Sequence, residues 1–404
     1  MFLNLSKLFI FLMIIYGNYF QVVFFSVRGT TEALGFMAVL FLLVAIYRKS
    51  MPLAAGISME TTLWFIFAFT SLFTGYFIMS DQTHLVLSVL QYIINLVLII
   101  ALCYISRFDE NIDFIVSVLL FLAFLCAITT IVWGQPFAGS DQISMTPSMN
   151  PNVLGLLLVF GIFSLLYKLD ISKRSSIVFV LFGTGLMFYT IILTASKKSF
   201  LAACFLILYW LLVVFGRMIR NVSINKKILA LTVLLVALSS YAFYMTPILQ
   251  DSVIMDRFST ISTGDETRIG MYQEAYQFFK SSPLLGIGFN NYRLLSVYHT
   301  YSHSTYAEVL ACTGLLGAVL YLSAFLIMAG KTIKIIADGR IDSSIRLQAR
   351  NIFGLLTVTL LLGAGVIHFY DMTSSIILAA IIAFNQVNSP TERRIVEKNA
   401  DMQV

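Results

Sequence analysis

The hydrophobic pattern of the chain is a succession of long apolar runs separated by mostly short polar segments. Twelve runs of about 17–25 residues are long enough to cross the hydrocarbon core of a bilayer as helices. The pattern therefore predicts an all-α, polytopic membrane protein with a single transmembrane domain over residues 1–404. The predicted spans are residues 8–27, 30–47, 61–79, 84–105, 112–133, 151–167, 176–195, 199–216, 227–247, 304–330, 345–367 and 371–388.

Composition supports this fold class. The chain is 59% hydrophobic and 11% charged, whereas soluble domains are about 45–50% apolar and about 25% charged. A soluble globular protein is therefore excluded. We expect the lipid bilayer as a partner and no nucleic acid.

The basic residues follow the alternation of the predicted spans. With a cytoplasmic N-terminus, 19 of the 26 Lys and Arg residues fall on the inner side, as the positive-inside rule requires. We therefore expect both termini in the cytoplasm. The cations left on the outer side are Arg28, Lys197, Lys198, Arg257, Arg268, Lys280 and Arg293.

The large outer segment, residues 248–303, is expected to contain an amphipathic helix, because its apolar residues recur at helical spacing. The helix has two interpretations: it lies on the lipid headgroups, or it presents Arg268 to a ligand. Arg268 falls in the predicted first turn, where a cation opposes the helix dipole. Either an anion shared with the helix N-terminus or a surface ion pair with Asp265 would account for it. The apolar residues are Ile269, Tyr272, Ala275, Tyr276 and Phe279.

Two glycine-containing stretches follow this helix. GIGF (286–289) lacks the strand and helix of a phosphate-binding fingerprint, so it predicts a turn that returns the chain to the membrane. In TGLLG (313–317), Gly314 and Gly317 are expected to allow close packing of a neighbouring helix.

The stretch YSHSTYAE (301–308) places a histidine directly before a predicted span. Thr305 and Glu308 have the spacing of a capping box, which gives Glu308 a structural role. His303 then lies beside the positive end of the helix dipole, which favours the neutral, proton-accepting imidazole. The alternative is a histidine at the membrane edge that hydrogen-bonds to a neighbour.

Three more outer residues have both a structural and a binding interpretation. Lys197 and Lys198 either snorkel from the end of a span or form a cationic patch for a phosphate group. Asn152 follows a predicted Asn150–Pro151 cap and could also contact a sugar or phosphate.

These outer residues form a combination that favours one kind of chemistry. Arg257, Arg268 and the two lysines are cations, and His303 is a candidate base, while the sequence has no D-x-D pair, His/Glu metal cluster, P-loop or serine-elbow motif. Side-chain cations without metal ligands suit a pyrophosphate leaving group, and a base such as His303 suits activation of the attacking hydroxyl. We therefore expect no metal and no cofactor.

Three stretches stand out as motifs: LTASKKSFL (193–201), RIGMYQEAYQFFKSSPLLGIGF (268–289) and SHSTYAEVLACTGLLG (302–317). Their order and spacing resemble the family of O-antigen ligases and O-antigen or capsule polymerases (Wzy-type membrane glycosyltransferases). The resemblance implies a helical, metal-independent glycosyltransferase whose donor glycan is linked to undecaprenyl pyrophosphate. It places the reaction on the outer face of the bacterial cytoplasmic membrane, with a flippase and a chain-length regulator as possible partners.

The resemblance also implies roles for particular residues. Arg268 corresponds to the pyrophosphate-binding arginine, His303 to the catalytic histidine and Tyr306 to the aromatic residue of the third motif. Lys197 stands where the family usually has arginine, so its role is less defined, because lysine offers a point charge rather than a bidentate fork. Ser304 stands where ligases often have asparagine, which favours a polymerase.

Three functions remain as hypotheses. The first is a polymerase of O-antigen, capsule or exopolysaccharide that transfers a glycan to a lipid-linked repeat unit. The second is a ligase that transfers finished polymer to lipid A-core, cell wall or protein. The third is a transporter of lipid-linked sugars, which the near absence of charged residues inside the spans disfavours.

Overall fold

The computed structural model describes residues 1–23, 30–48, 56–137, 140–147, 149–170, 173–216, 253–254 and 263–389. The long helices are α3 (Thr30–Arg48), α4 (Met59–Ile78), α5 (Gln82–Asp109), α6 (Asp113–Trp133), α7 (Pro151–Lys168), α8 (Arg174–Thr194), α9 (Lys197–Tyr209), α13 (Thr263–Ser281), α15 (Thr305–Ala337), α16 (Ser343–Leu362) and α17 (Met372–Asn388). The shorter elements are α1 (Phe2–Ile15), the π-helical turn Tyr16–Phe20, α2 (Gln21–Val23), strands β1 (Gln135–Pro136) and β2 (Ile143–Ser144), the π-helical segment Trp210–Phe215, α14 (Tyr292–Leu295) and the 3-10 turn His368–Tyr370.

The predicted all-α membrane fold is confirmed. Within the described residues, nine helices are long and apolar enough to cross a membrane, and two shorter apolar helices accompany them. Eleven of the predicted spans coincide with helices, whereas the span at 227–247 lies outside the described residues, as does Arg257.

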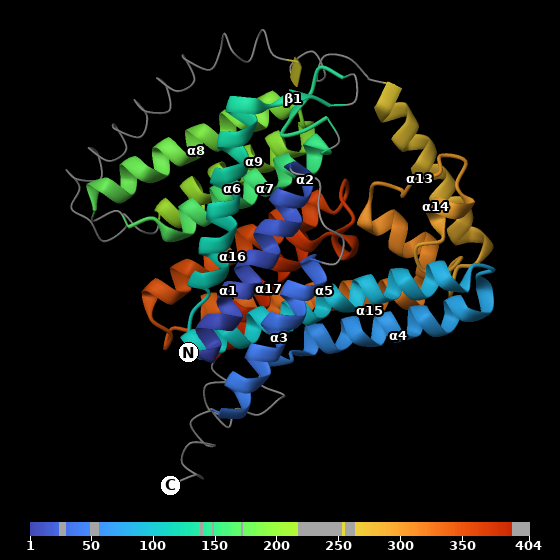
Figure 1. Cartoon of the computed structure of the whole chain (residues 1–404), viewed down its shortest axis with the longest axis horizontal. Helices are drawn as coiled ribbons and strands as arrows, with labels where there is room; N and C mark the ends of the chain where they lie inside the picture. The colour runs from blue at the N-terminus through green and yellow to red at the C-terminus, as the bar shows by residue number, and fades with distance from the viewer. Residues whose placement is uncertain are drawn as a thin grey trace.

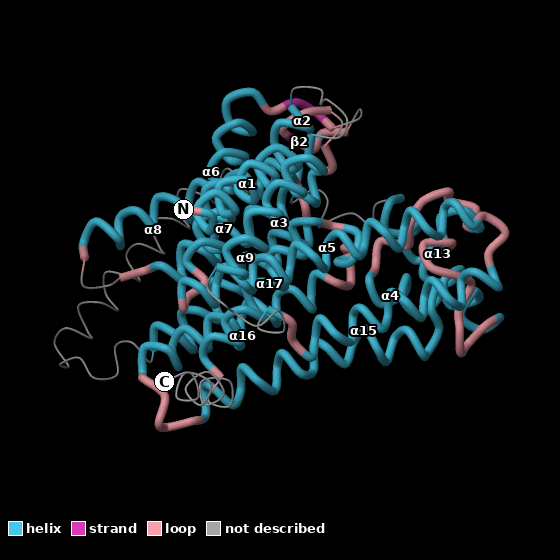
Figure 2. Tube along the Cα trace, turned by 60° about the horizontal axis from the view of Figure 1, so that its bottom comes forward, coloured by secondary structure: helices cyan, strands magenta, loops and turns pink. Residues whose placement is uncertain are grey.

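The helices pack in groups around α17 (Figure 1). Helices α6, α7, α8 and α9 gather on one side, and α4, α5 and α15 run together on another. Helix α17 packs on α5 and also contacts α15 and α16, while α16 reaches α9. Helix α13 lies beyond one end of α4, α5 and α15, as the second view shows from another direction (Figure 2).

Ion pairs near the predicted inner ends of the helices join elements far apart in sequence. Lys7 on α1 pairs with Asp109 on α5 at 2.6 Å, and Lys331 on α15 pairs with Glu60 on α4 at 3.0 Å. The alternation of spans assigns these helix ends to one side and α13 to the other. Which of the two sides faces the cytoplasm stays a prediction.

Helix α13 corrects one sequence expectation. It already includes Thr263, so Arg268 lies beyond the first turn, where the helix dipole has little effect. Met271 and Ala275 are buried, and Ala275 packs with Ala311 and Cys312 of α15, whereas Ile269 and Tyr276 are exposed.

The loop after α13 pairs its backbone with a break in α15. Gly314 has φ 62° and ψ −162°, which interrupts the helix. The N–H groups of Ile287 and Gly288 donate to the carbonyls of Ala311 and Cys312 at 3.0 and 2.9 Å, and Leu315 N–H donates to Pro283 at 2.8 Å. The predicted glycine turn is thus present, but Gly314 packs against this loop rather than against a helix.

Gly317 behaves as expected. A Cβ atom there would overlap the Thr313 side chain of the same helix and would also come within 3.1 Å of the Phe67 ring on α4, and α4 packs along α15. The absence of a side chain therefore allows the two helices to approach closely.

Candidate active site

A cavity of about 220 Å³ lies where several helix ends meet. Its walls come from the start of α7, from α13 and α14, from the turn before α15, and from the loop between α16 and α17. The alternation of spans assigns all these ends to the outer side. The lining residues are Asn150, Asn152, Val153, Arg268, Arg293, Tyr301, His303, Gly365, Val366, Ile367, Tyr370 and Asp371.

His303 lies in a tightly held turn. Its backbone is left-handed, with φ 59°, a conformation that non-glycine residues adopt infrequently. Glu308, fully buried on α15, accepts a 2.8 Å hydrogen bond from the N–H of Ser302, and the Ser302 hydroxyl donates to the Ser304 carbonyl at 3.1 Å. The imidazole lies against Tyr301, with 4.4 Å between the ring centroids.

The predicted capping box is wrong in detail. Ser304 is the N-cap of α15, and its hydroxyl accepts from Ala307 N–H, while Thr305 donates its hydroxyl to the Val366 carbonyl at 2.7 Å. The Glu308 carboxyl group accepts from the backbone N–H of Ser302, two residues before the N-cap, rather than from the N-cap itself. Its role is structural, as predicted, but it fixes the turn that carries His303.

The electrostatic surroundings keep His303 neutral. Burial lowers the pKa of the imidazole, and the positive charges of Arg268 and Lys198 lower it further, to about 4. At neutral pH the ring therefore has a free lone pair that can accept a proton. The helix-dipole argument from the sequence predicted the same direction, but desolvation is the largest cause.

The loop between α16 and α17 forms one wall and is fixed by side chains from three helices. Three backbone carbonyls of the loop accept hydrogen bonds from these side chains. The Gly365 carbonyl accepts from Lys198 on α9 at 3.1 Å, and the Ala364 carbonyl accepts from Tyr272 on α13 at 3.0 Å. The Val366 carbonyl accepts from Thr305 on α15. A Cβ atom on Gly365 would overlap the Lys198 side chain. A larger residue at this position would therefore displace the end of the Lys198 side chain from the wall.

The other residues predicted to bind substrate have different positions. Asn152 lines the cavity, and its side-chain oxygen accepts from the Ser196 hydroxyl at 2.9 Å, which links α7 to the turn before α9. Neither Lys197 nor Lys198 is among the lining residues in the described part of the chain, although Lys198 donates to the Gly365 carbonyl in the cavity wall. Tyr306 donates its hydroxyl to the Leu360 carbonyl at 2.6 Å and does not line the cavity.

Sequence analysis did not single out four of the polar side chains that line the cavity. Arg293 had one signal, its position among the few outer cations, whereas Tyr301, Tyr370 and Asp371 had none that set them apart. Asp371 caps α17, accepting from the N–H and hydroxyl of Ser374 at 2.7 and 2.8 Å. Burial raises the pKa of this carboxyl group.

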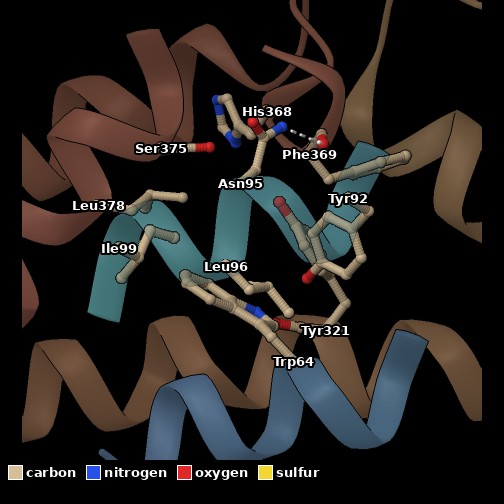
Figure 3. Close-up of a pocket in the computed structure, with 10 residues that line it drawn as sticks. All are labelled: Trp64, Tyr92, Asn95, Leu96, Ile99, Tyr321, His368, Phe369, Ser375 and Leu378. Atoms are coloured by element: carbon tan, nitrogen blue, oxygen red, sulfur yellow. Dashed lines mark hydrogen bonds between the residues drawn. The ribbon is translucent and has the colours of Figure 1, made fainter. Parts of the chain in front are cut away.

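A second cavity, beside His368, is too small for a substrate (Figure 3). Its volume is about 10 Å³, which is about the space for one water molecule. Asn95 crosses it to donate to the Phe369 carbonyl at 3.2 Å. His368 is therefore part of the packed interior.

The described residues contain no group of three or more His, Cys, Asp and Glu side chains that could hold a metal ion. Whether catalysis works without a metal stays a prediction. The cavity instead offers two guanidinium groups, a neutral imidazole, two asparagines and two tyrosines, together with the carboxyl group of Asp371, which caps α17. These can bind an anion and hydrogen-bond to sugar hydroxyls.

Comparison with known families identifies a domain in this chain. Residues 182–322 match a family model described as O-antigen ligase. The chain thus carries an O-antigen ligase domain over about a third of its length. The match spans all three sequence motifs and includes Arg268 and His303, which confirms the resemblance. No curated protein matches the chain.

The O-antigen ligase domain does not form the cavity alone. Asn150 and Asn152 precede the matched residues, and Gly365 to Asp371 follow them. The cavity therefore forms only when α7 and the loop between α16 and α17 pack against the domain.

Proposed function

We propose that this protein is a polysaccharide polymerase, transferring a glycan from undecaprenyl pyrophosphate to a lipid-linked repeat unit on the outer face of the cytoplasmic membrane. The observation that carries the proposal is that one cavity contains both Arg268 and an imidazole kept neutral at physiological pH. The family match over residues 182–322 supports an enzyme of the O-antigen ligase or polymerase type.

In the proposed reaction, His303 removes the proton from an acceptor hydroxyl, and the oxygen attacks the anomeric carbon of the donor glycan. A new C–O bond forms while the bond from the anomeric carbon to the pyrophosphate oxygen breaks. The pyrophosphate leaves with its negative charge stabilised by Arg268. The proton remains on His303 until it is released to water.

Anion binding prepares His303 for this step. In the empty cavity the charges of Arg268 and Lys198 repel a proton from the imidazole. A bound pyrophosphate offsets those charges, which raises the pKa of His303 and makes it a stronger base. The base would therefore be strongest when the donor is in place.

A ligase that transfers finished polymer is the second candidate, because the matching family model is described as O-antigen ligase. Ser304 does not separate the two functions. It caps α15, and asparagine would do the same.

The decisive experiment gives purified full-length protein a synthetic lipid-linked repeat unit and measures release of undecaprenyl pyrophosphate. We expect release together with longer glycans, and loss of both in Arg268→Ala and His303→Ala. A transporter would give no release. In cells, loss of a polymerase leaves single repeats attached to the final acceptor, whereas loss of a ligase leaves polymer on the lipid carrier.

A further inference from the structure

We propose that Arg293 is a second pyrophosphate-binding residue, which contacts the leaving group from the wall of the cavity formed by α14. This inference rests on the proposed function and adds a residue to its anion site. Arg293 lines the same cavity as Arg268 and His303. It lies on the outer segment, 25 positions after Arg268, and belongs to none of the three sequence motifs.

Aromatic rings position the Arg293 guanidinium. Its central carbon lies 5.8 Å from the ring centroid of Tyr301 and 5.6 Å from that of Tyr370. Both rings also line the cavity. Contacts of this kind orient the planar group and leave its N–H groups able to donate to a ligand.

The guanidinium lacks the hydrogen bonds that a structural arginine would make. Its Nε atom is buried and has no hydrogen-bond partner among the described residues. No carboxylate in the described part of the chain forms an ion pair with it. It acts on Glu308 electrostatically, but that carboxyl group accepts from Ser302 instead. Arg293 as a whole is half-buried, but its buried Nε donor lacks an acceptor, which costs free energy, and an anionic ligand would supply the missing hydrogen bond.

Two guanidinium groups in one cavity favour a ligand with more than one negative charge. Arg268 comes from α13 and Arg293 from α14, so a pyrophosphate could accept from both. Each arginine can form a bidentate contact with phosphate oxygens. A carboxylate offers only one negative charge, and a phosphate monoester offers oxygens on only one phosphorus atom, whereas a pyrophosphate spreads its charge over two phosphorus atoms.

A carboxylate on α13 holds α14 in place. Glu274 Oε2 accepts from the hydroxyls of Tyr292 at 2.7 Å and Ser296 at 2.5 Å, and Oε1 accepts from Val297 N–H at 3.0 Å. Tyr292 and Ser296 flank Arg293 closely in sequence. The position of Arg293 relative to α13, which carries Arg268, is therefore fixed before any ligand binds.

Binding of farnesyl diphosphate to the purified full-length protein tests the proposal, with farnesyl monophosphate as the comparison ligand. We expect Arg293→Gln to weaken diphosphate binding about 10-fold or more, as loss of a charge-assisted contact predicts. Arg293→Lys keeps the charge without the planar fork and should weaken it less. The advantage of diphosphate over monophosphate should shrink in both variants.

Lys280→Gln is the matched control. Lys280 is also a cation over an aromatic ring, 4.7 Å from the Tyr276 centroid, but it is exposed and outside the cavity. We expect its affinity for farnesyl diphosphate to equal that of the wild type. Equal affinity in both Arg293 variants would overturn the inference, and so would an Arg293→Gln protein that loses thermal stability but no affinity. If Arg293→Gln does not fold, Arg293→Lys with wild-type affinity overturns it.

The inference and the proposed function can fail separately. If the wild type binds farnesyl diphosphate through Arg293 but releases no undecaprenyl pyrophosphate from a lipid-linked repeat, the proposed function fails. If Arg268→Ala and His303→Ala abolish that release while Arg293→Gln changes neither release nor binding, only the role of Arg293 fails.

Discussion

The buried carboxyl group of Glu308 accepts a 2.8 Å hydrogen bond from the backbone N–H of Ser302, the residue directly before His303. This contact runs backward from the first turn of α15 and closes the left-handed turn at His303. It explains why a carboxyl group lies fully buried near the start of a membrane-spanning helix: the group satisfies a buried backbone donor.

Substitution of Glu308 should separate this role from direct catalysis. Glu308→Ala leaves the Ser302 N–H buried without an acceptor, which costs about 1–3 kcal/mol of stability, and we expect a lower melting temperature and slower transfer. Glu308→Gln retains an acceptor oxygen and should keep most of both. Thermal unfolding and pyrophosphate release measure the two effects. Equal loss of transfer in both variants, with unchanged melting temperature, would instead indicate that the acid itself takes part in the reaction.

The pH dependence of His303 is the second prediction. Because the pKa of His303 in the empty cavity is about 4, the imidazole is protonated only at acid pH. We expect kcat/KM to stay flat down to about pH 5.5. The fall of kcat at acid pH should begin at a higher pH than the fall of kcat/KM. The reason is that bound pyrophosphate offsets the charges of Arg268 and Lys198 and so raises the pKa of His303. If kcat and kcat/KM both fell with a midpoint near the ordinary histidine pKa of about 6.5, the described electrostatics would be contradicted.

The same electrostatics can be tested without turnover. Arg268→Gln and Lys198→Gln should each raise the pKa of His303, because each removes a repelling positive charge. The pH at which diethyl pyrocarbonate begins to modify His303, followed by mass spectrometry, should therefore rise. The exposed His299 in the same loop gives an internal reference.

Sequence reasoning was most successful where one signal acts locally. Apolar length located the spans, and the outer segment was expected to contain a helix. The turn at His303 was less accessible, because Ser304 and Thr305 are both plausible caps and the choice depends on Val366, which lies 61 positions away. Tyr370 and Asp371 carry no signal that distinguishes them from other residues at a span end. They join the site only because α17 packs beside α15.

The paired glycines give a third prediction. Gly286 has φ 70°, and a Cβ atom on it would lie 2.4 Å from the Cys312 carbonyl carbon; at Gly314 a Cβ atom would lie 2.4 Å from Leu284 backbone. Alanine at either position should destabilise the protein by about 1–3 kcal/mol. Gly330→Ala, also in α15, is the control, because nothing lies within 4 Å of the new atom. A wild-type melting temperature for Gly286→Ala would refute the close backbone contact.

Glu274 gives the fourth prediction, as a positioning residue for Arg293. Glu274→Ala removes both acceptor oxygens, so the contacts to the Tyr292 and Ser296 hydroxyls and to Val297 N–H are all lost. We expect KM for the lipid-linked donor to rise several-fold with a smaller change in kcat, and the acid limb of kcat/KM to stay in place. Kinetics over a range of donor concentration and pH would measure this. A shifted pH profile would show that Glu274 acts on His303 rather than through α14.

The two adjacent lysines give the last prediction. The family resemblance points to Lys197 as the pyrophosphate contact, whereas in the structure Lys198 donates to Gly365 and lowers the pKa of His303. We expect Lys198→Gln to reduce pyrophosphate release about 10-fold or more, because it frees the loop carrying Gly365 and removes a charge near the anion. Neither lysine lines the cavity within the described residues, but Lys198 holds the cavity wall through Gly365 and lowers the pKa of His303. We therefore expect Lys197→Gln to retain a larger share of the activity. If Lys197→Gln abolishes release and Lys198→Gln does not, the prediction is wrong. Lys197 would then be the pyrophosphate contact, as the family resemblance implies, and donor binding would have to bring it into the cavity.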